Sequence, residues 1–307
     1  MTLPLDDENV RLGVIGVGAM GAPMARRLLH ARGSLSVFTR SPRPDLEAGG
    51  ATLVATPREL AARSDAILVM LPDLPELEAV LDGEDGLLAG ADTLLLMIGS
   101  TSSPTGVRAL AERLHRTSGG AIRVVDCPVS GGADGAEDGT LSIMIGGAGD
   151  DAARAAALLA PCGRAVHLGP LGAGEVAKAC NQLVVAATIT ALGEATELAA
   201  RSGLDLDALW ALLSGGYAGS NLLTSRRHRL VSGDDSPLRR RQIHGEGSRL
   251  RRRRGRGHRH PPRSAPRPAR HLRRDRRGGT RRPGHLGDAS AHRPSSCCAD
   301  DPRGGLR

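Results

Sequence analysis

Short apolar runs alternate with longer amphipathic segments through about the first 170 residues of the chain. The runs RLGVIG, SLSVFTR, AILVML, TLLLMIG and AIRVVDCPV predict strands over 11–16, 34–40, 66–71, 93–99 and 121–129. Because these runs are continuously apolar rather than alternating, both faces of each strand are expected to be buried. Helical periods separate the runs. The pattern predicts an α/β fold with a doubly wound parallel sheet.

After one more predicted strand over 139–147, the pattern becomes helical. A long helix is predicted from about Gly174 to Arg201, and another within LDLDALWALLSGG, residues 204–216. The helical pattern stops near Pro237. We therefore expect an α/β domain over 1–170, a linker helix with the start of an incomplete all-α domain over 171–237, and a tail over 238–307.

A glycine-rich turn follows the first predicted strand and opens the first predicted helix. It has the form Gly16-x-Gly18-x-x-Gly21, and Ala19 and Met20 lie between the last two glycines. In a Rossmann domain such glycines permit a tight turn, a close approach of backbone to a pyrophosphate, and close packing of helix on strand. The N–H groups at the helix start would bind the phosphates. A dinucleotide cofactor is expected here.

The end of the second predicted strand indicates which dinucleotide binds. An NAD site usually carries a carboxylate about 20 residues after the glycines, for the ribose hydroxyls. This chain has Thr39, Arg40 and Ser41 there. A guanidinium and two hydroxyls would bind a 2′-phosphate that a carboxylate would repel. NADP is therefore favoured, with NAD as the alternative.

Lys178 is the only lysine in the chain and lies on the long predicted helix, in GAGEVAKACNQ. Asn181 and Gln182 follow it by three and four residues, so each places an amide near the amine on one helix face. Val176 and Val184 suggest that this part of the helix is partly buried. A buried lysine can donate or accept a proton, which arginine cannot. A solvated surface lysine is the alternative.

Four motifs together resemble the β-hydroxyacid dehydrogenases, the family of 3-hydroxyisobutyrate dehydrogenase and tartronate semialdehyde reductase. They are GVIGVGAMGAPMARRLL, DCPVSGG, GTLSIMIGG and GAGEVAKACNQ, and the resemblance covers residues 10 to about 237. Related imine reductases look similar but lack the lysine, so Lys178 argues against them.

The resemblance implies an NAD(P)-dependent oxidoreductase that transfers a hydride between the cofactor and a small hydroxyacid or semialdehyde. Lys178 would be the general acid/base, and Asn181 or Gln182 would position the substrate. Ser130 and the backbone of Gly131 and Gly132 would hold the substrate carboxylate. The nicotinamide side would be lined by residues of two loops: Leu71, Pro72, Ser100 and Thr101. The resemblance implies a homodimer or tetramer, but the family's further C-terminal helices are absent after about residue 237, so this assembly is doubtful for this chain.

Composition separates the tail from the rest of the chain. Residues 1–237 hold 19 basic and 28 acidic residues, for a net charge of −9, whereas 238–307 hold 22 and 5, for +17. The tail is rich in Arg, Pro and Gly, has no aromatic residue, and is expected to be disordered. One interpretation is a basic arm that binds nucleic acid non-specifically, attached to an inactive NADP-binding remnant.

The other interpretation is a frameshift near Pro237. Arginine codons in a GC-rich gene, read one base later, encode Ala, Asp, Glu, Val and Gly. With permitted third bases, Gly245–Gly257 then reads VKDLGFAADEAAG, which supplies a KDLxxA motif that the resemblance implies and this sequence lacks. This interpretation is favoured, and it predicts weak or absent activity.

The remaining features limit the cellular setting. The five cysteines have no disulfide-framework or zinc-site spacing, so no metal is expected. The acidic start MTLPLDDENV is unlike a signal peptide. No apolar run reaches about 18 residues, so no membrane span is expected. The sequence favours a cytoplasmic enzyme.

Overall fold

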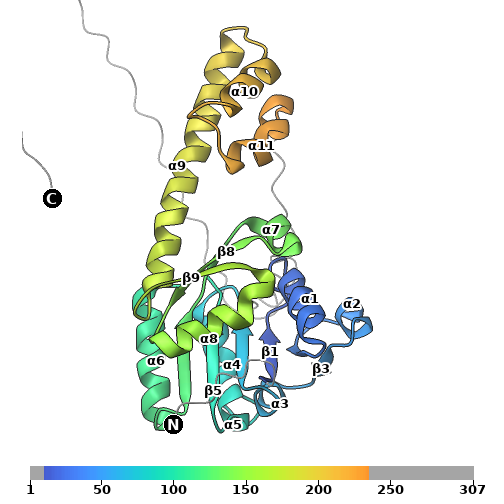
Figure 1. Ribbon diagram of the computed structural model, residues 1–307, viewed down its shortest axis with the longest axis vertical. Coiled ribbons are helices and arrows are strands. Elements are labelled where there is room, and N and C mark those ends of the chain that lie inside the picture. The colour runs from blue at the N-terminus through green and yellow to red at the C-terminus, as the bar shows by residue number, and fades with distance from the viewer. Residues whose placement is uncertain (1–9, 235–307) are drawn as a thin grey trace, which may run out of the picture. The chain divides into compact units, whose positions relative to one another are not determined.

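The structure is a computed structural model that describes residues 10–234. The basic tail, its expected disorder and the hypothesised frameshift concern residues beyond 234 and lie outside the described part. Within residues 10–169 a sheet is covered by helices on both faces (Figure 1). This confirms the predicted α/β Rossmann architecture.

The sheet has nine strands in the order β3-β2-β1-β4-β5-β6-β8-β7, with β9 also paired to β8. The first six strands in this order are all parallel to one another. Chain order reverses between β1 and β4, which is the topological switch point of a doubly wound sheet. The strands are β1 Leu12–Ile15, β2 Ser36–Phe38, β3 Thr52–Val54, β4 Ala66–Val69, β5 Leu94–Ile98, β6 Ile122–Asp126, β7 Val129–Ser130, β8 Leu141–Gly146 and β9 Gly163–Gly169.

The sheet is parallel over most of its width, as expected, and mixed at one end. β8 is antiparallel to both β6 and β7. The apolar run over 121–129 is two strands, because the chain leaves the ladder at Cys127-Pro128. β9 was missed in the sequence, because its residues GRAVHLG are half-exposed or exposed and lack a long apolar run.

Two apolar cores lie on the two faces of the sheet. On one face Met24 and Leu28 of α1 and Leu158 of α8 pack with the strands. On the other, Leu60 of α3, Leu77 of α4 and Leu110 of α6 pack with them. The helices are α1 Gly21–Arg32, α2 Pro44–Ala48, α3 Pro57–Ala62, α4 Leu74–Leu81, α5 Leu87–Gly90, α6 Pro104–Ser118, α7 Gly132–Asp138 and α8 Gly149–Leu159.

The long predicted helix is observed as α9, Ala173–Arg201, and Figure 1 shows it running from the sheet to α10, Leu206–Ser214, and α11, Asn221–Ser232. α11 is a third helix that the sequence pattern did not predict, because NLLTSRRHRLVS has a weak apolar period. Its start is capped by Ser220, whose side chain accepts the Leu223 N–H at 3.1 Å. Leu192, Trp210 and Leu223 form a small third core between these helices.

Much of the apolar surface of α9 is exposed. Val176 and Val184 are at least half exposed, so the burial near Lys178 that their presence suggested has another source. α9 is also long and apolar enough to cross a membrane by length and composition alone, a test that core helices of soluble proteins also pass. No membrane-spanning segment was expected from the sequence, and α9 is an exception by length and composition.

Candidate active site

The loops that follow β1, β4, β5 and β6 meet at the carboxyl edge of the sheet, because parallel strands end on the same side. The glycine-rich turn follows β1 at the switch point. Leu71 and Pro72 follow β4, and Ser100 and Thr101 follow β5. Ligands of open α/β sheets bind at this edge. The topology therefore brings the predicted cofactor residues to one place.

Each glycine of the turn meets a distinct steric demand. Gly16 has φ +94°, and a Cβ there would lie 2.5 Å from the Met70 carbonyl oxygen. A Cβ on Gly21 would lie 1.9 Å from the Gly16 carbonyl oxygen. A Cβ on Gly18 would meet nothing within 4 Å, and Gly18 and Ala19 are exposed. The turn is thus tight on its inner side and open where a pyrophosphate would approach the start of α1, so these residues fit a dinucleotide.

The end of β2 is polar and basic. The Thr39 hydroxyl donates to the Ser41 carbonyl at 3.0 Å, which closes a short turn around the exposed Arg40. Arg43 follows, and its guanidinium donates to the Val17 carbonyl and pairs with Asp45 at 2.8 Å. Arg43 therefore braces the glycine-rich turn from the β2 side, a contact that the sequence did not reveal.

Lys178 is buried, with 9% of its surface exposed. Its Nζ donates to the Val129 carbonyl oxygen at 2.8 Å. Burial lowers the pKa of its amine, and the nearby Glu175 opposes that shift. The burial comes from packing of the start of α9 on the sheet rather than from apolar neighbours along the helix. The amine is therefore fixed in position, with its charged form partly destabilised.

The predicted carboxylate loop lies beside this amine. The Ser130 hydroxyl donates to Oδ1 of Asn181 at 3.3 Å. The carbonyl of Val129, the residue before Ser130, accepts the hydrogen bond from Lys178 Nζ. Asn181 Nδ2 in turn donates to Oε1 of the exposed Gln182 at 3.3 Å. Of the two candidate amides, Asn181 contacts the loop directly. Gly131 and Gly132 have positive φ and lead into α7.

Asp126 fixes the start of the helix that carries Lys178. Its Oδ1 accepts the Gly172 N–H and its Oδ2 accepts the Glu175 N–H, both at 2.7 Å. The side chain is fully buried, which raises its pKa, while these backbone hydrogen bonds act the other way. A Cβ on Gly174 would lie 2.8 Å from Asp126 Oδ2, so only glycine permits this close approach.

Glu175 is a second buried carboxyl group that sequence reasoning missed. Its Oε2 accepts the Ser102 N–H at 3.0 Å, which joins α9 to the loop after β5. Burial first, and then Asp126 and Asp73, raise its pKa to about 7. A glutamate in the first turn of a helix is ordinary in a sequence. The signal available was the position of Glu175 three residues before the only lysine.

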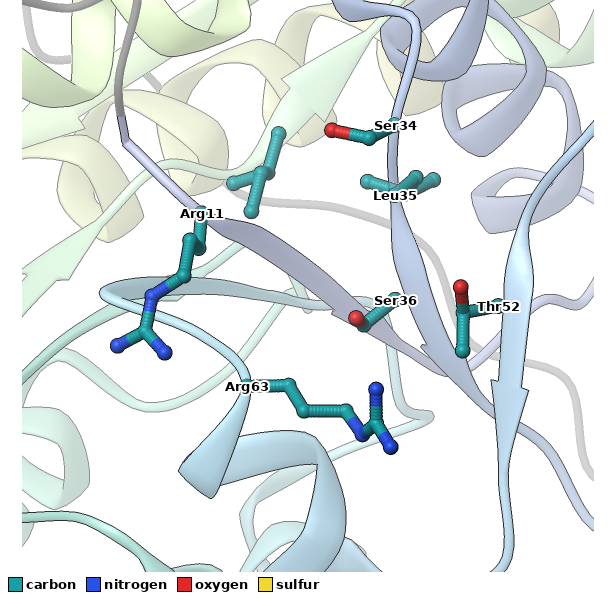
Figure 2. A pocket seen from close by; sticks show the side chains of 7 residues that line it. Arg11, Ser34, Leu35, Ser36, Thr52 and Arg63 are labelled. Atoms are coloured by element: carbon teal, nitrogen blue, oxygen red, sulfur yellow. The ribbon is translucent and has the colours of Figure 1, made fainter.

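A separate pocket lies at the other edge of the sheet, where β1, β2 and β3 begin. Figure 2 shows Arg11 and Arg63 beside Ser36 and Thr52 in this pocket. Arg11 is paired with Asp65 at 2.7 Å and Arg63 with Glu59 at 3.2 Å. Both guanidiniums are thus already neutralised, and the pocket lies away from the candidate site. The described residues also hold no cluster of His, Cys, Asp and Glu arranged for a metal ion.

Comparison with protein families assigns both parts of the described chain. Residues 11–170 match the model for the NAD binding domain of 6-phosphogluconate dehydrogenase. Residues 172–240 match the model described as NAD-binding of NADP-dependent 3-hydroxyisobutyrate dehydrogenase. The second match covers α9, so its apolar surface belongs to a helix of that domain.

Relatives and solved structures agree with this assignment. The 2-hydroxy-3-oxopropionate reductase of Escherichia coli is 37% identical over 235 residues, which cover 74% of this chain and 78% of that protein. The mitochondrial 3-hydroxyisobutyrate dehydrogenase of Drosophila melanogaster is 39% identical over 197 residues, which cover 63% and 60%.

A solved 3-hydroxyisobutyrate dehydrogenase of Mycobacterium tuberculosis with L-serine has a TM-score of 0.64 and 28% identity, and the match covers 74% of this chain and 80% of that one. These matches show a nicotinamide cofactor and a small hydroxyacid-type substrate. The chain belongs to the β-hydroxyacid dehydrogenase family of NAD(P)-dependent oxidoreductases.

Proposed function

We propose that the site interconverts a small hydroxyacid and its semialdehyde, with NADP(H) preferred and Lys178 as the general acid/base. The observation that carries the proposal is the buried Lys178 amine at the Val129 carbonyl, beside the Ser130–Asn181 hydrogen bond. An amine whose pKa is lowered gives up its proton more readily than a free lysine, which suits it to both donate and accept a proton. The names of the relatives, reductases and dehydrogenases of 3-carbon to 4-carbon acids among them, support the same substrate class.

A nicotinamide held by the glycine-rich turn would supply the hydride that reduces the carbonyl carbon. Lys178 Nζ–H donates a proton to the carbonyl oxygen, and an alcohol results. In the direction of oxidation the neutral amine takes the proton from the hydroxyl. The Val129 carbonyl orients the amine, because it accepts one of the Nζ hydrogens. Lysine is suited to this role because its pKa responds to burial, whereas that of arginine remains too high.

The substrate carboxylate is assigned to Ser130 and the following glycines. The Ser130 hydroxyl and the N–H groups of Gly131 and Gly132 are donors of the kind that bind anions. Asn181 holds the Ser130 hydroxyl at 3.3 Å, so we assign Asn181 rather than Gln182 as the positioning amide. The Lys178 amine is held by Val129, the residue directly before Ser130. A substrate whose carboxylate is bound at Ser130 would therefore have its carbonyl close to that amine.

The preference for NADP rests on the end of β2. The exposed Arg40 lies between Thr39 and Ser41, and no carboxylate takes the place expected in an NAD site. The guanidinium would pair with a 2′-phosphate, and the two hydroxyls would donate to it. The glycine-rich turn would hold the pyrophosphate at the start of α1.

The test is turnover of NADPH with tartronate, methylmalonate and succinate semialdehydes. We expect measurable turnover with at least one of them that is lost in Lys178→Arg, which keeps the charge and removes the titratable amine. Glu194→Gln, an exposed change on the same helix, is the matched control. Full activity of Lys178→Arg would refute the role of Lys178.

We also propose that the altered C-terminus impairs the enzyme. Around α9 and α10, Leu183 is 73% exposed, Leu198 70% and Leu212 76%. Where such side chains form a continuous apolar surface, that surface marks a contact with further helices or a second subunit. A homodimer or tetramer would cover these leucines. We expect the purified chain to be a monomer, as measured by light scattering, and to turn over its substrate slowly.

The second candidate function is non-specific binding of nucleic acid by the basic tail of an inactive remnant. The excess of 22 basic over 5 acidic residues after position 237 supports it. Binding of this kind weakens steeply as salt rises, because it depends on release of counterions. Fluorescence anisotropy with random duplex DNA at two salt concentrations tests it, and absence of binding at low salt excludes it.

A further inference from the structure

Glu175 lies one helical turn before Lys178, and only 1% of its surface is exposed. Its Oε2 accepts the Ser102 N–H at 3.0 Å. Ser102 lies in the loop after β5 that also carries Ser100 and Thr101, the residues assigned to the nicotinamide side. One carboxyl group thus contacts the cofactor loop and stands on the helix of the proposed catalytic lysine.

Three side-chain oxygens at this junction are buried without a hydrogen-bond partner in the described part of the chain. They are Oε1 of Glu175 and the hydroxyls of Ser100 and Ser102. A buried acceptor that lacks a donor is costly, and such groups are rare outside functional sites. A proton on the carboxyl group removes the charge that Oε1 would otherwise carry without a donor. Burial of the unpartnered Oε1 thus favours the neutral acid, while the Ser102 N–H on Oε2 favours the carboxylate.

Three charged side chains from three parts of the described fold act on Glu175. Asp126 approaches from β6, where its Oδ2 accepts the Glu175 N–H, and Asp73 acts from the loop after β4. Lys178 is the one cation among these neighbours, and it stands on α9 itself. Burial and the two aspartates favour a protonated carboxyl group, while Lys178 and the Ser102 amide favour the carboxylate. Glu175 and Lys178 are three residues apart on α9 and so are neighbours on the helix surface, which is why the charge of one acts on the other.

We propose that Glu175 is a positioning residue that joins the Ser100–Ser102 loop to α9 and sets the charge of Lys178. The proposal rests on the proposed role of Lys178. As a carboxylate, Glu175 accepts the Ser102 amide and favours the ammonium form of Lys178, which reduction requires. As a neutral acid, it attracts neither group strongly. Both effects change together, because the same carboxyl group makes both interactions.

The sole lysine of the chain makes a direct test possible. Protein grown with ¹³C-labelled lysine gives one side-chain Cε signal, which reports the Lys178 amine without any assignment. We expect that signal in the full-length chain to move in two steps with pH, a small one near pH 7 when Glu175 titrates and a large one when Lys178 titrates. In Glu175→Gln the small step disappears and the large step moves to lower pH, since the nearby negative charge is gone.

Glu194→Gln on the exposed face of α9 is the control and is expected to titrate as the wild type does. A single step in the wild type, or unchanged titration in Glu175→Gln, overturns the proposal. The wild-type measurement decides the matter even where Glu175→Gln does not fold.

Activity separates this proposal from the proposed function. Two-step titration together with full turnover by Lys178→Arg leaves the coupling intact and refutes the catalytic role. Loss of turnover in Lys178→Arg, together with a single-step titration of the wild type, supports the catalytic role and refutes the coupling between Glu175 and Lys178. Glu175→Asp, which restores a titratable group one methylene shorter, is expected to restore the step near neutral pH.

Discussion

The carboxylate of Asp126, the last residue of β6, accepts the backbone N–H of Glu175 in the first turn of α9, at 2.7 Å. The N-cap residue of α9 is Gly172, which has no side chain to cap the helix. Asp126 supplies the cap from a distant strand and accepts the Gly172 N–H as well. The central sheet and the helix of Lys178 are thereby fixed to each other, which is why the amine has a defined position at the sheet edge.

Replacement of Asp126 by Asn is expected to destabilise the fold by about 1–3 kcal/mol, the cost of leaving a buried donor unpaired. An amide nitrogen would face one of the two N–H groups that Oδ1 and Oδ2 now accept. Urea denaturation measures the change, and Asp92→Asn, at an exposed position, is the control. Equal stability of the two variants would show that Asp126 does not hold the helix.

Stability is expected to fall as pH rises through neutrality because of Glu175. Its pKa is raised from 4.5 to about 7 in the fold, so the folded chain binds a proton more tightly than the unfolded chain does. The contribution is therefore complete below about pH 4.5 and is lost as pH rises through 7, by at most about 3 kcal/mol.

Glu175→Gln imitates the protonated acid and removes this dependence. We expect the variant to match the wild type at pH 5 and to be more stable at pH 8, as measured by urea denaturation at both values. A variant that is less stable than the wild type at pH 8 would mean that Glu175 is held as a carboxylate in the fold.

Two alanine substitutions in the glycine-rich turn should separate folding from cofactor binding. Gly21→Ala places a Cβ 1.9 Å from the Gly16 carbonyl, so the turn must open and thermal stability should fall by several degrees. Gly18→Ala meets nothing within 4 Å, so the chain should unfold at the wild-type temperature. NADPH fluorescence titration is expected to show weaker binding for both. Normal NADPH binding by Gly18→Ala would place the pyrophosphate elsewhere.

Arg40→Glu is expected to weaken NADPH binding by roughly 10- to 100-fold, the range for loss of a hydrogen-bonded ionic contact. NADH binding should be unchanged or tighter, because a carboxylate suits the ribose hydroxyls. Arg164→Glu makes the same charge change at another exposed position, on β9, and serves as the control. An equal effect of both variants would indicate a general charge effect rather than recognition of the 2′-phosphate.

The coding DNA tests the proposed frameshift near Pro237. We expect codons 230–245 to contain an inserted or deleted base, and the downstream sequence, read one base later, to encode VKDLGFAADEAAG or a close variant. The exposed Leu183, Leu198 and Leu212 support the expectation that further helices belong on this part of the fold. Stop codons throughout the alternative frame would contradict it.

The sequence by itself determined strands β1, β2, β4, β5, β6 and β8, the glycine-rich turn and the long helix with Lys178. These features depend on local rules: continuous apolar runs form strands buried on both faces, and a glycine turn between strand and helix is a short-range signal. The family resemblance also followed from the sequence, because its motifs are contiguous stretches. The family itself was later shown by the comparisons.

Only the tertiary structure decided which side chains act together. Asp126 lies 49 residues before Glu175 in the chain and yet contacts it, a pairing that no local pattern encodes. β3, β9 and α11 were missed, because short or partly exposed elements at the edge of a fold lack a strong apolar period. The burial of Lys178 also depends on how α9 packs on the sheet, since its apolar neighbours Val176 and Val184 face solvent. Burial and buried charge depend on contacts between distant segments, and those contacts exist only in the folded chain.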